Sequence, residues 1–560
     1  MKHKNSLSLL SFMLLCSLSM AQVNITDSYF APDQTYKWTK NNVYLLDGLC
    51  YVDSNSVLEI EAGTVVKFTS RADVGNPSAL VIQRGAKIIA NGTKTEPIIF
   101  TTEGDDPADP TDVTNPHAKN SLWGGIVILG KGKTVKNGNS VVTVEGIATT
   151  EPRGRYGMPI GQEDNSDSSG VLRYVSIRHG GRQLTSGNEL NGLTLGAVGS
   201  RTKLEYIEVY ANSDDGIEFF GGAPNLKYAA VAFAEDDSYD WDEAYVGKGQ
   251  FWFSIQRSDI ADLGYELDGT TPDDGTPYSN GTVFNATHIG AGNGASAANP
   301  LAILLRAGTA GTIANSIFTD TRGKGIEIQD KASPVNDAYE KLKNGELKVM
   351  SNLFWKTGTT TALDDIIRIT STADEKDAAT LKSHLATNKN MVSDPMFYGV
   401  GRATDNQLYP VPSSSAMEVT SNLATIPTDP FFTAVDYKGA FAPDDTTNFW
   451  LKGWTALWKN GHLKKSVVLG LDNASELVSS FNIFPNPSNG LVNVAYTINS
   501  DKNLKLSIYN SIGEEVIVNS NALSAGNYSQ TLDFSTLNSG TYFIRFSDGK
   551  KSFTKAVVKE

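Results

Sequence analysis

The sequence predicts an all-β protein: a right-handed parallel β-helix (solenoid) followed by a small C-terminal antiparallel β-sandwich. Short β-rich runs, broken by Gly or Asn, recur at intervals of about 22 residues, which is the length of one β-helix coil. The end of the chain instead alternates apolar and polar residues between Gly, Asn and Ser turns, as antiparallel sandwiches do. Leucine-rich repeats have a similar length, but their dense Leu and Asn signature is missing from this sequence.

Internal similarity delimits the solenoid. A single coil cannot bury its apolar face alone, so coils stack and their equivalent side chains form columns. We expect coils over about residues 40–395, with loops at 103–120, 269–280 and 331–347 and a short helix at 374–387. The recurring segments are 58–63 with 80–85; 172–177 with 204–209 and 226–231; 281–285 with 311–315 and, more loosely, 349–352; and 214–219 with 236–241.

The N-terminus is typical of a secretory signal peptide, predicted over residues 1–21. Basic residues at 2–4 precede an apolar run at 7–18, and Ser19-Met20-Ala21 offers a small-x-small cleavage site. No stretch approaches the roughly 20 apolar residues that a membrane helix needs, so we expect no transmembrane segment. Cleavage after Ala21 would leave Cys50 as the single cysteine, which we expect to be a buried apolar side chain.

Residues 481–560 form the second predicted domain, after a linker at 463–480. Phe484-Pro485-Asn486-Pro487 opens it, an alternating strand covers 504–509, and a glycine-to-strand step lies at 539–545. These features resemble the C-terminal sorting domain of the type IX secretion system of Bacteroidetes. The resemblance implies that the type IX machinery is a partner. It also implies passage through the periplasm, followed by secretion or attachment to the outer-membrane surface.

The segment 436–458, before the linker, is rich in aromatic residues. Similar sequences close the β-helix in secreted Bacteroidetes proteins that carry this sorting domain. We therefore predict that Trp450, Trp454 and Trp458 cap the open end of the solenoid, so that the β-helix domain with its cap covers 22–462. A sugar-stacking platform is the alternative role for these tryptophans.

One pair of repeats contains the acidic residues that are candidates for a functional site. Residues 214–219 align with 236–241; 264–268 fit the next coil, and 325–328 a later one. Alternate residues of a strand face opposite sides, so each repeat has an inward and an outward set. The predicted inward columns are Ile217, Tyr239, Tyr265 and Ile326, with Phe219, Trp241, Leu267 and Ile328 beside them. The predicted outward residues are Glu218, Asp240, Glu266 and Glu327, joined by Asp242 and Asp268.

Outward carboxylates on neighbouring coils would lie roughly 4.8 Å apart. At that distance their mutual repulsion raises a pKa or attracts a cation. Hard oxygen ligands in a flexible cluster suit Ca²⁺, which is the candidate cofactor. The candidate metal ligands are Asp214, Asp215, Glu218, Asp236, Asp237, Asp240 and Asp242, with Glu243 at the edge.

Two other interpretations of these acidic residues stay open. They can form a solvated acidic face, in keeping with the formal net charge of −14. In that case Lys227, Lys248 and Arg257 would pair with some of the acids. They can also form a catalytic carboxylate cluster.

Known β-helix enzymes provide a comparison. Asn212-Ser213-Asp214-Asp215-Gly216 resembles the acidic motif of polygalacturonase-type glycosidases, in which paired carboxylates act as acid and base. His179 precedes these acids, however, where that family places its histidine after them, and no Arg-Ile-Lys motif follows. Pectate-lyase-like enzymes combine Ca²⁺ carboxylates with a basic residue, for which Arg257, Arg306 and Arg322 are candidates. No motif selects one, so we assign no catalytic residue.

Composition argues against other classes of function. A net charge of −14 is unfavourable for nucleic-acid binding. Two cysteines and six histidines are too few for a structural zinc site, and no glycine-rich segment fits a phosphate-binding loop.

Two functions from different classes follow. We favour a secreted or cell-surface, non-catalytic β-helix protein that binds a polysaccharide or an envelope glycan, with Ca²⁺ as the candidate ligand of its acidic face. The alternative is a polysaccharide lyase or glycoside hydrolase acting through the acidic patch around residues 214–268.

Overall fold

The structure is a computed structural model of the chain. It describes residues 21–560 except 72–74, 110–119, 186–187, 293, 297–300, 333–335, 359–362, 364–365, 372–377, 406, 446–448, 464–477, 499–503, 511–512 and 548–551. Contacts divide the chain into two compact units, 1–465 and 466–560, which we describe separately.

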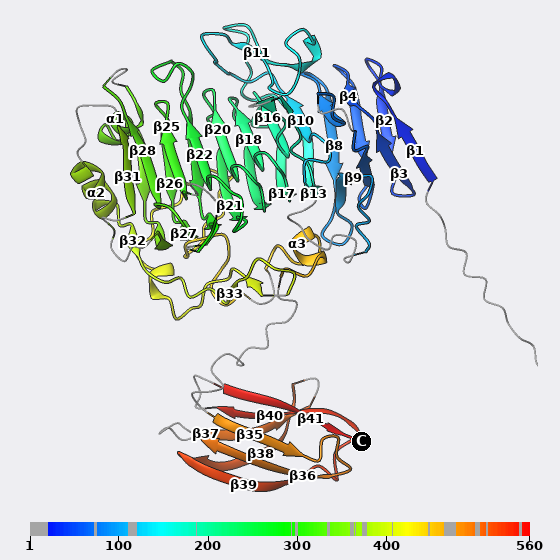
Figure 1. The fold of residues 1–560 in the computed structure, drawn as a ribbon, viewed down its shortest axis with the longest axis vertical. Coiled ribbons are helices and arrows are strands. Elements are labelled where there is room, and N and C mark those ends of the chain that lie inside the picture. The colour runs from blue at the N-terminus through cyan, green and yellow to red at the C-terminus, as the bar shows by residue number, and fades with distance from the viewer. Residues whose placement is uncertain are drawn as a thin grey trace, which may run out of the picture. The chain divides into compact units, whose positions relative to one another are not determined.

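The first unit is a parallel β-helix, as predicted, whose coils stack along the solenoid (Figure 1) and contribute strands to a 10-stranded and an 18-stranded sheet. Long strands bend within the 18-stranded sheet, so it forms two faces and the 10-stranded sheet forms the first. The right-handed sense of the coil stays a prediction. The first face is a 10-stranded parallel sheet. Its strands are β4 (Leu49–Val52), β7 (Ala79–Ile82), β10 (Ile126–Leu129), β16 (Leu193–Gly196), β18 (Ile217–Phe220), β20 (Tyr239–Asp242), β22 (Tyr265–Asp268), β25 (Ile303–Arg306), β28 (Ile326–Asp330) and β31 (Ile367–Ser371).

The second and third faces share long strands that bend from one face to the next. In β13, residues 171–173 pair with β8 and residues 175–177 with β9. The bending strands are β13 (Gly170–Arg178), β17 (Lys203–Tyr210), β19 (Asn225–Ala232) and β21 (Lys248–Ile255). The second face also holds β2 (Thr35–Trp38), β5 (Val57–Ile60), β8 (Lys87–Asn91), β23 (Asn280–Phe284), β26 (Ala310–Ala314) and β29 (Leu347–Met350). The third holds β1 (Ala21–Ile25), β3 (Asn42–Leu46), β6 (Val65–Phe68), β9 (Ile98–Thr102), β24 (Thr287–Ile289), β27 (Ile317–Thr321), β30 (Leu353–Thr357) and β32 (Met391–Val392).

Strand register confirms most of the predicted repeats. The runs 172–177, 204–209 and 226–231 are hydrogen-bonded neighbours in successive coils. The pairing of 58–63 with 80–85 is wrong, because Leu58 belongs to β5 on the second face and Leu80 to β7 on the first. A strand followed by a glycine turn occurs on more than one face, so that signature alone does not determine which strands are equivalent.

Inward side chains fill the solenoid and confirm the predicted inward columns. Ile217 pairs with Tyr239, and Tyr239 with Tyr265. The next residue in this column is Ile303, and Ile326 follows one coil later. All of these side chains belong to one continuous apolar core. The alternation of inward and outward residues is therefore kept from β18 to β28 on the first face.

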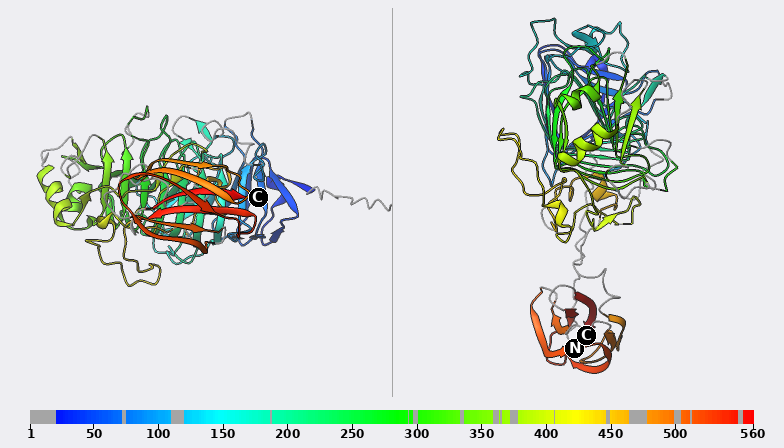
Figure 2. Two further views of the ribbon diagram at one scale, coloured as in Figure 1. Left: turned by 90° about the horizontal axis from the view of Figure 1, so that it is seen from below. Right: turned by 90° about the vertical axis from the view of Figure 1, so that its left-hand side faces the viewer.

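Two helices cover the last coil. The helix α1 (Ala338–Lys343) lies in a segment predicted to be a loop, and α2 (Ala378–Thr387) lies within the predicted helix 374–387. Leu342 and Leu381 join the solenoid core, and Figure 2 shows both helices in front of the coils when the solenoid is viewed end-on. The loop prediction fails at α1 because its N-cap, Asp337, accepts the backbone N–H of Glu340 at 3.0 Å and so starts a helix.

The aromatic segment lies along the side of the solenoid, which corrects the predicted cap over its end. The described residues of 422–463, namely 422–445 and 449–463, are here called the strap and run across the bends of the long strands. The Trp450 ring lies 5.7 Å from the Tyr228 ring, and the Trp454 ring 5.5 Å from the Tyr174 ring. Because Trp450 and Trp454 are buried in these contacts, neither is a sugar-stacking platform.

In the later coils asparagines connect the bends to the strap. Asn285 and Asn315 take the bend position with φ of 57° and 50°. The Asn285 amide donates to the carbonyl oxygen of Tyr437 at 2.7 Å. The Asn315 side chain donates to the Ala424 carbonyl at 2.9 Å and accepts the Ala424 N–H at 2.8 Å. Asparagine tolerates this left-handed backbone and pairs with a passing peptide group at the same time.

Residues 130–169, here called the insertion, fold over the outward face of the first sheet. No repeat or motif in the sequence predicts this arrangement. Its strands β11 (Val141–Thr143) and β12 (Arg155–Gly157) pair antiparallel. Tyr156 and Ile147 pack on outward apolar residues of the early coils, such as Val81 and Val127. The insertion therefore covers the apolar part of this face, and its Lys136 and Glu145 reach the neighbouring acidic residues.

The remaining elements of the first unit are short. They are β14 (Gln183–Thr185), β15 (Asn188–Glu189), β33 (Gly399–Val400), β34 (Leu408–Tyr409), α3 (Ala456–Lys459), and the 3₁₀ helices η1 (Asp27–Tyr29), η2 (Pro152–Gly154) and η4 (Met417–Val419).

The second unit is a small β domain made of two antiparallel sheets, as predicted. The two sheets share one apolar core, which includes Val494, Ile508 and Ile544. One sheet holds β35 (Val478–Phe484), β36 (Leu491–Ile498) and β39 (Gly526–Asp533); the other holds β38 (Glu515–Leu523), β37 (Leu504–Tyr509), β40 (Gly540–Ser547) and β41 (Ser552–Lys559).

Some predictions fall largely outside the described residues. These are the signal peptide at 1–21, except its last residue, and most of the linker at 463–480. Within the part that is described, no helix is long and apolar enough to cross a membrane. Cys50 is buried, as predicted, and burial raises the pKa of its thiol to about 12.

Candidate functional site

The outward side chains of β18, β20 and β22 form one wall of a cavity of about 390 Å³. Glu218 pairs with Asp240, and Asp240 with Glu266, which confirms the predicted outward column in these coils. The column does not continue to Glu327, because Leu304 in β25 stands between Glu266 and Glu327. The acidic wall is therefore limited to three successive coils.

Acidic side chains dominate this cavity. Among the described residues twelve carboxylates line it, together with Asn191, Phe220 and only two cations, Lys136 and Arg306. The seven predicted metal ligands all lie on its wall. The twelve carboxylates are Glu145, Glu189, Asp214, Asp215, Glu218, Asp236, Asp237, Asp240, Asp242, Asp262, Glu266 and Asp268.

Sequence reasoning missed three of the carboxylates and one amide. Glu145 belongs to the insertion, and Glu189 and Asn191 lie at the end of the β14–β15 hairpin. The side chain of Asn191 donates to Glu145 at 3.2 Å and also to Glu218, which joins the opposite walls. These residues carry no repeat signal, whereas Asp262, just before β22, follows the coil pattern and was detectable.

Backbone contacts position two of the aspartates. The Oδ1 atom of Asp215 accepts the N–H of Asp237 at 2.9 Å, and Oδ1 of Asp237 accepts the N–H of Leu263 at 2.6 Å. Each carboxylate thus holds the turn of the following coil. This repeated contact explains why an aspartate recurs at this place in the repeat and why both face the same cavity.

Three groups of carboxylates have the spacing of a metal site. In each group the ligand oxygens lie within 4.8 Å of one another. Ca²⁺ binds oxygens at about 2.3–2.6 Å, so oxygens around one ion are separated by at most about 5 Å. Asp215 and Asp236 each belong to two groups, which links the three, and Asp242 belongs to none. The groups are Asp214, Asp215 and Asp236; Asp215, Glu218 and Asp240; and Asp236, Asp237 and Asp262.

Asp240 provides an independent indication of a ligand. The residue is only 8% exposed, and its Oδ1 atom is buried without a hydrogen-bond partner. A buried carboxylate oxygen with no donor is unfavourable by roughly 1–3 kcal/mol or more. A cation between Asp240, Asp215 and Glu218 would satisfy it.

Burial and mutual repulsion raise the pKa values of these carboxyl groups. Burial, with Glu145 and Glu189 nearby, raises the pKa of Asp214 to about 9. Burial also raises the pKa of Asp268 to about 8, although Arg306 opposes the shift, and raises that of Asp242 to about 6. The solvated acidic face, one interpretation of the sequence, fits Asp236 and Asp262, which are exposed, but not the buried carboxylates Asp214, Asp215, Glu218, Asp237 and Asp240.

The predicted counter-charges lie elsewhere. Lys248 forms an ion pair with Asp429 of the strap, and Arg257 binds Asp259 at 2.8 Å. Lys227 donates to the carbonyl oxygen of Phe431 at 2.7 Å. None of these three cations lines the cavity, so they do not neutralise it.

Arg306 is the candidate base that lies in the cavity; Arg257 and Arg322 do not line it. Its guanidinium group contacts Asp268 at 2.8 Å and Glu266 at 3.1 Å. Burial lowers the pKa of Arg306, but these carboxylates raise it more, and the net shift is upward. Arg306 therefore stays protonated in this arrangement and is a poor proton acceptor.

Glu243 and His179, two further candidate site residues, are buried in the fold and do not line the cavity. Glu243 is not at the edge of the cavity but fully buried, where it accepts hydrogen bonds from Tyr156 at 2.7 Å and Thr134 at 2.8 Å. It fastens the insertion to the solenoid. His179 is also buried, with its ring 5.8 Å from that of Tyr210, and it does not line the cavity.

Comparison with known proteins gives two matches. The family described as a pectate-lyase like beta helix domain matches residues 31–404, which is more than half of the chain. The family described as a secretion system C-terminal sorting domain matches residues 482–560. This domain indicates export by the type IX system to the cell surface or the medium. No curated protein matches the sequence.

Proposed function

The chain belongs to the pectate-lyase-like β-helix family, and we propose that it is a non-catalytic, Ca²⁺-binding surface or secreted protein that binds a polysaccharide or an envelope glycan. The main observation in favour of the calcium site is the Oδ1 atom of Asp240, which is buried without a hydrogen-bond partner. Asp240 also belongs to one of three carboxylate groups that share residues and have the spacing of a metal site.

The donor set favours Ca²⁺ over other metals. All of the ligand groups are carboxylates, and no Cys or His lines the cavity among the described residues, which disfavours Zn²⁺ and other soft-ligand metals. Mg²⁺ demands near-ideal octahedral geometry at about 2.0–2.1 Å, whereas Ca²⁺ accepts irregular sets of six to eight oxygens. Since the groups share Asp215 and Asp236, more than one ion fits along the column.

Exposure of the outer group supports a role in glycan binding. Asp236 and Asp262 are exposed at the rim, while Asp237 is buried. An ion held by this group would face solvent and keep coordination positions for a sugar hydroxyl or carboxylate. The bound charge would also reduce the repulsion of anionic polymers by the acidic wall.

Thermal unfolding tests the metal site. After removal of metal with a chelator, Ca²⁺ should raise the Tm by several degrees, because a ligand at one hundred times its Kd stabilises the folded state by about 2.7 kcal/mol. Asp240→Asn should weaken Ca²⁺ binding at least tenfold. Glu327→Gln, an outward acid outside the cavity, is the matched control. The calcium site is ruled out if Ca²⁺ leaves the wild-type Tm unchanged.

A polysaccharide lyase or glycoside hydrolase is the second candidate. Burial raises the pKa values of Asp242 and Asp262 to about 6, which suits a general acid or base near neutral pH. The assay is release of unsaturated or reducing sugars from polyuronates and neutral polysaccharides. Turnover that Asp240→Asn abolishes would replace the non-catalytic proposal. If the protein is active and substitution of Asp214, Asp215, Asp236 or Asp240 leaves its turnover unchanged, the active site lies elsewhere.

A further inference from the structure

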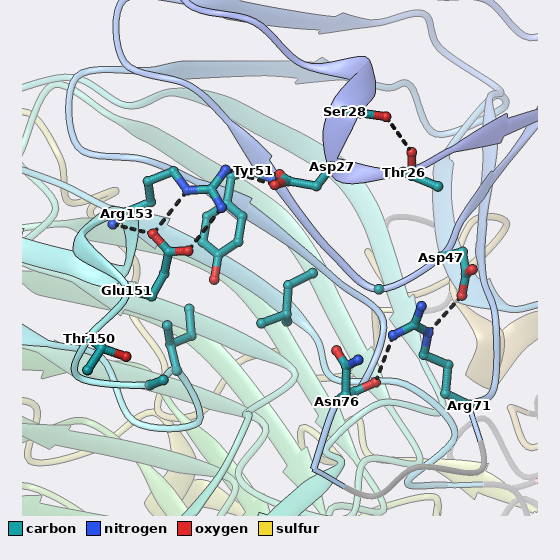
Figure 3. Close-up of a pocket in the computed structure, with 14 residues that line it drawn as sticks. Thr26, Asp27, Ser28, Asp47, Tyr51, Arg71, Asn76, Thr150, Glu151 and Arg153 are labelled. Carbon is teal, nitrogen blue, oxygen red and sulfur yellow. Dashed lines mark hydrogen bonds and ion pairs between the residues drawn. The ribbon is translucent and has the colours of Figure 1, made fainter.

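A second, larger cavity of about 820 Å³ lies beside the first strands of the solenoid (Figure 3). We propose that it is a second glycan-binding site, independent of Ca²⁺, and that its ligand is a neutral oligosaccharide. This inference rests on the proposed glycan-binding function and adds to it a site outside the acidic cavity. The volume is within the range of about 300–1,000 Å³ that is typical of small-molecule sites.

Two ion-paired clusters form opposite sides of this cavity (Figure 3). On one side, the Arg153 guanidinium binds both oxygens of Asp27, at 3.1 and 2.9 Å, and both oxygens of Glu151, at 3.0 and 2.9 Å. On the other side, Arg71 binds Asp47 at 2.8 Å. The side chains of Asp27 and Asp47 are 40% and 46% exposed, so their carboxylates reach the cavity.

These polar groups are held in place before any ligand arrives. The Arg153 guanidinium lies 4.1 Å from the centre of the Tyr51 ring. The backbone N–H of Tyr51 donates to Asp27 at 3.1 Å, and Glu151 caps η2 by accepting the N–H of Arg153 at 3.0 Å. Side chains from three distant parts of the chain are thereby fixed, which reduces the entropy that binding must overcome.

The charge balance indicates a neutral ligand. Three carboxylates and two guanidinium groups line the cavity, and they already satisfy one another. An anionic ligand would have to displace a carboxylate from a guanidinium group, and a cation would meet one carboxylate charge in excess of the two guanidinium charges. A sugar hydroxyl donates to a carboxylate and accepts from a guanidinium at the same time, so it can add to these pairs without breaking them.

The rest of the lining suits the apolar side of a sugar ring. Leu49, Ile147 and Ala148 contribute aliphatic surface to the lining, and Thr26 and Thr150 contribute hydroxyl groups. This mixture of aliphatic surface and a few fixed polar groups is common in small-molecule sites. The acidic cavity, by contrast, has almost no aliphatic lining and a large excess of carboxylates.

The test uses the full-length protein and isothermal titration calorimetry with cellotriose, maltotriose and mannotriose, and with trigalacturonate as the charged comparison. At least one neutral trisaccharide should bind with a Kd in the millimolar range or tighter. Ala148→Trp, at an exposed position in the lining, should weaken binding at least tenfold. Thr149→Trp, the exposed neighbour outside the lining, should change it less than twofold.

The inference is overturned if no neutral trisaccharide binds, if trigalacturonate binds more tightly, or if Ala148→Trp binds like the wild type. The Asp240→Asn variant separates this site from the metal site. Trisaccharide binding that persists in Asp240→Asn supports two independent sites. Binding that Asp240→Asn abolishes would place the glycan at the acidic cavity and contradict this inference alone. Intact trisaccharide binding without any Ca²⁺ effect on the Tm would contradict only the calcium site.

Discussion

Single residues at the strand bends show how side chains compensate for an unfavourable backbone. Tyr174, Tyr206, Tyr228 and Phe251 all adopt left-handed angles, with φ between 47° and 59°. Only Gly, and to a lesser extent Asn and Asp, adopt this region readily. The rings stack at 4.4, 4.4 and 4.9 Å along successive coils. Such aromatic pairs contribute about 0.5–1.5 kcal/mol each beyond burial, which offsets the backbone cost.

Another single residue, His288, should make the stability depend on pH. Its ring is fully buried, with Nδ1 2.9 Å from the Ser254 hydroxyl, and burial, assisted by Arg402, lowers its pKa to about 3. The unfolded chain binds a proton at pH values below about 6.5, and the folded protein does not. The free energy of unfolding should therefore fall from pH 6.5 towards pH 3, by about 2 kcal/mol at pH 5.

His288→Phe is the variant that checks this contribution. Phe318 and Phe354 follow His288 in the same column, so a phenyl ring continues the existing stack. Urea unfolding at pH 7.5 and pH 5 should show a smaller loss of stability in the variant than in the wild type. An equal loss in both proteins would mean that His288 does not control this pH dependence.

At the scale of elements, the strap locks the bends of the solenoid. Its short helix α3 begins where the buried carboxylate of Glu208 accepts the N–H groups of Ala456 at 2.6 Å and Leu457 at 3.1 Å. Glu208 also accepts the hydroxyl of Ser176 at 2.6 Å, which ties it to the neighbouring coil. Backbone donors at a helix start and a carboxylate are mutually favourable, so this contact fixes the end of the strap.

Trp454→Ala should detach this end of the strap. The indole is fully buried against Tyr174, and truncating a buried Trp destabilises by about 3–5 kcal/mol. Urea unfolding and limited proteolysis between residues 422 and 463 would measure the effect. Trp458→Ala, at a half-buried position, is the control and should cost much less. Equal effects of the two changes would contradict this role of the tryptophan.

At the scale of the whole molecule, the two units have separate cores and separate tasks. The apolar core of the solenoid and that of the C-terminal sandwich share no residues. The sorting domain indicates the route of export, while both cavities belong to the first unit. Binding and export should therefore be separable.

Deletion of residues 466–560 tests this separation. The first unit should keep its Tm within about 2 °C and its response to Ca²⁺, since independent cores unfold independently. Export should be lost, which fractionation of cells with a type IX system into periplasm, surface and medium would detect. Export of the truncated protein at wild-type levels would contradict the assignment of the sorting signal to the second unit.

The sequence by itself determined the solenoid, the C-terminal sandwich and the acidic column in successive coils. These follow from local patterns: alternation along a strand and recurrence at the coil length, as in 214–219 and 236–241. Only the tertiary structure decided that the insertion folds back to enclose the acidic residues, that Glu145 and Glu189 complete their cavity, and that the strap lies along the side. Those contacts join segments far apart in the chain, and a long-range contact leaves no period in the sequence that could reveal it.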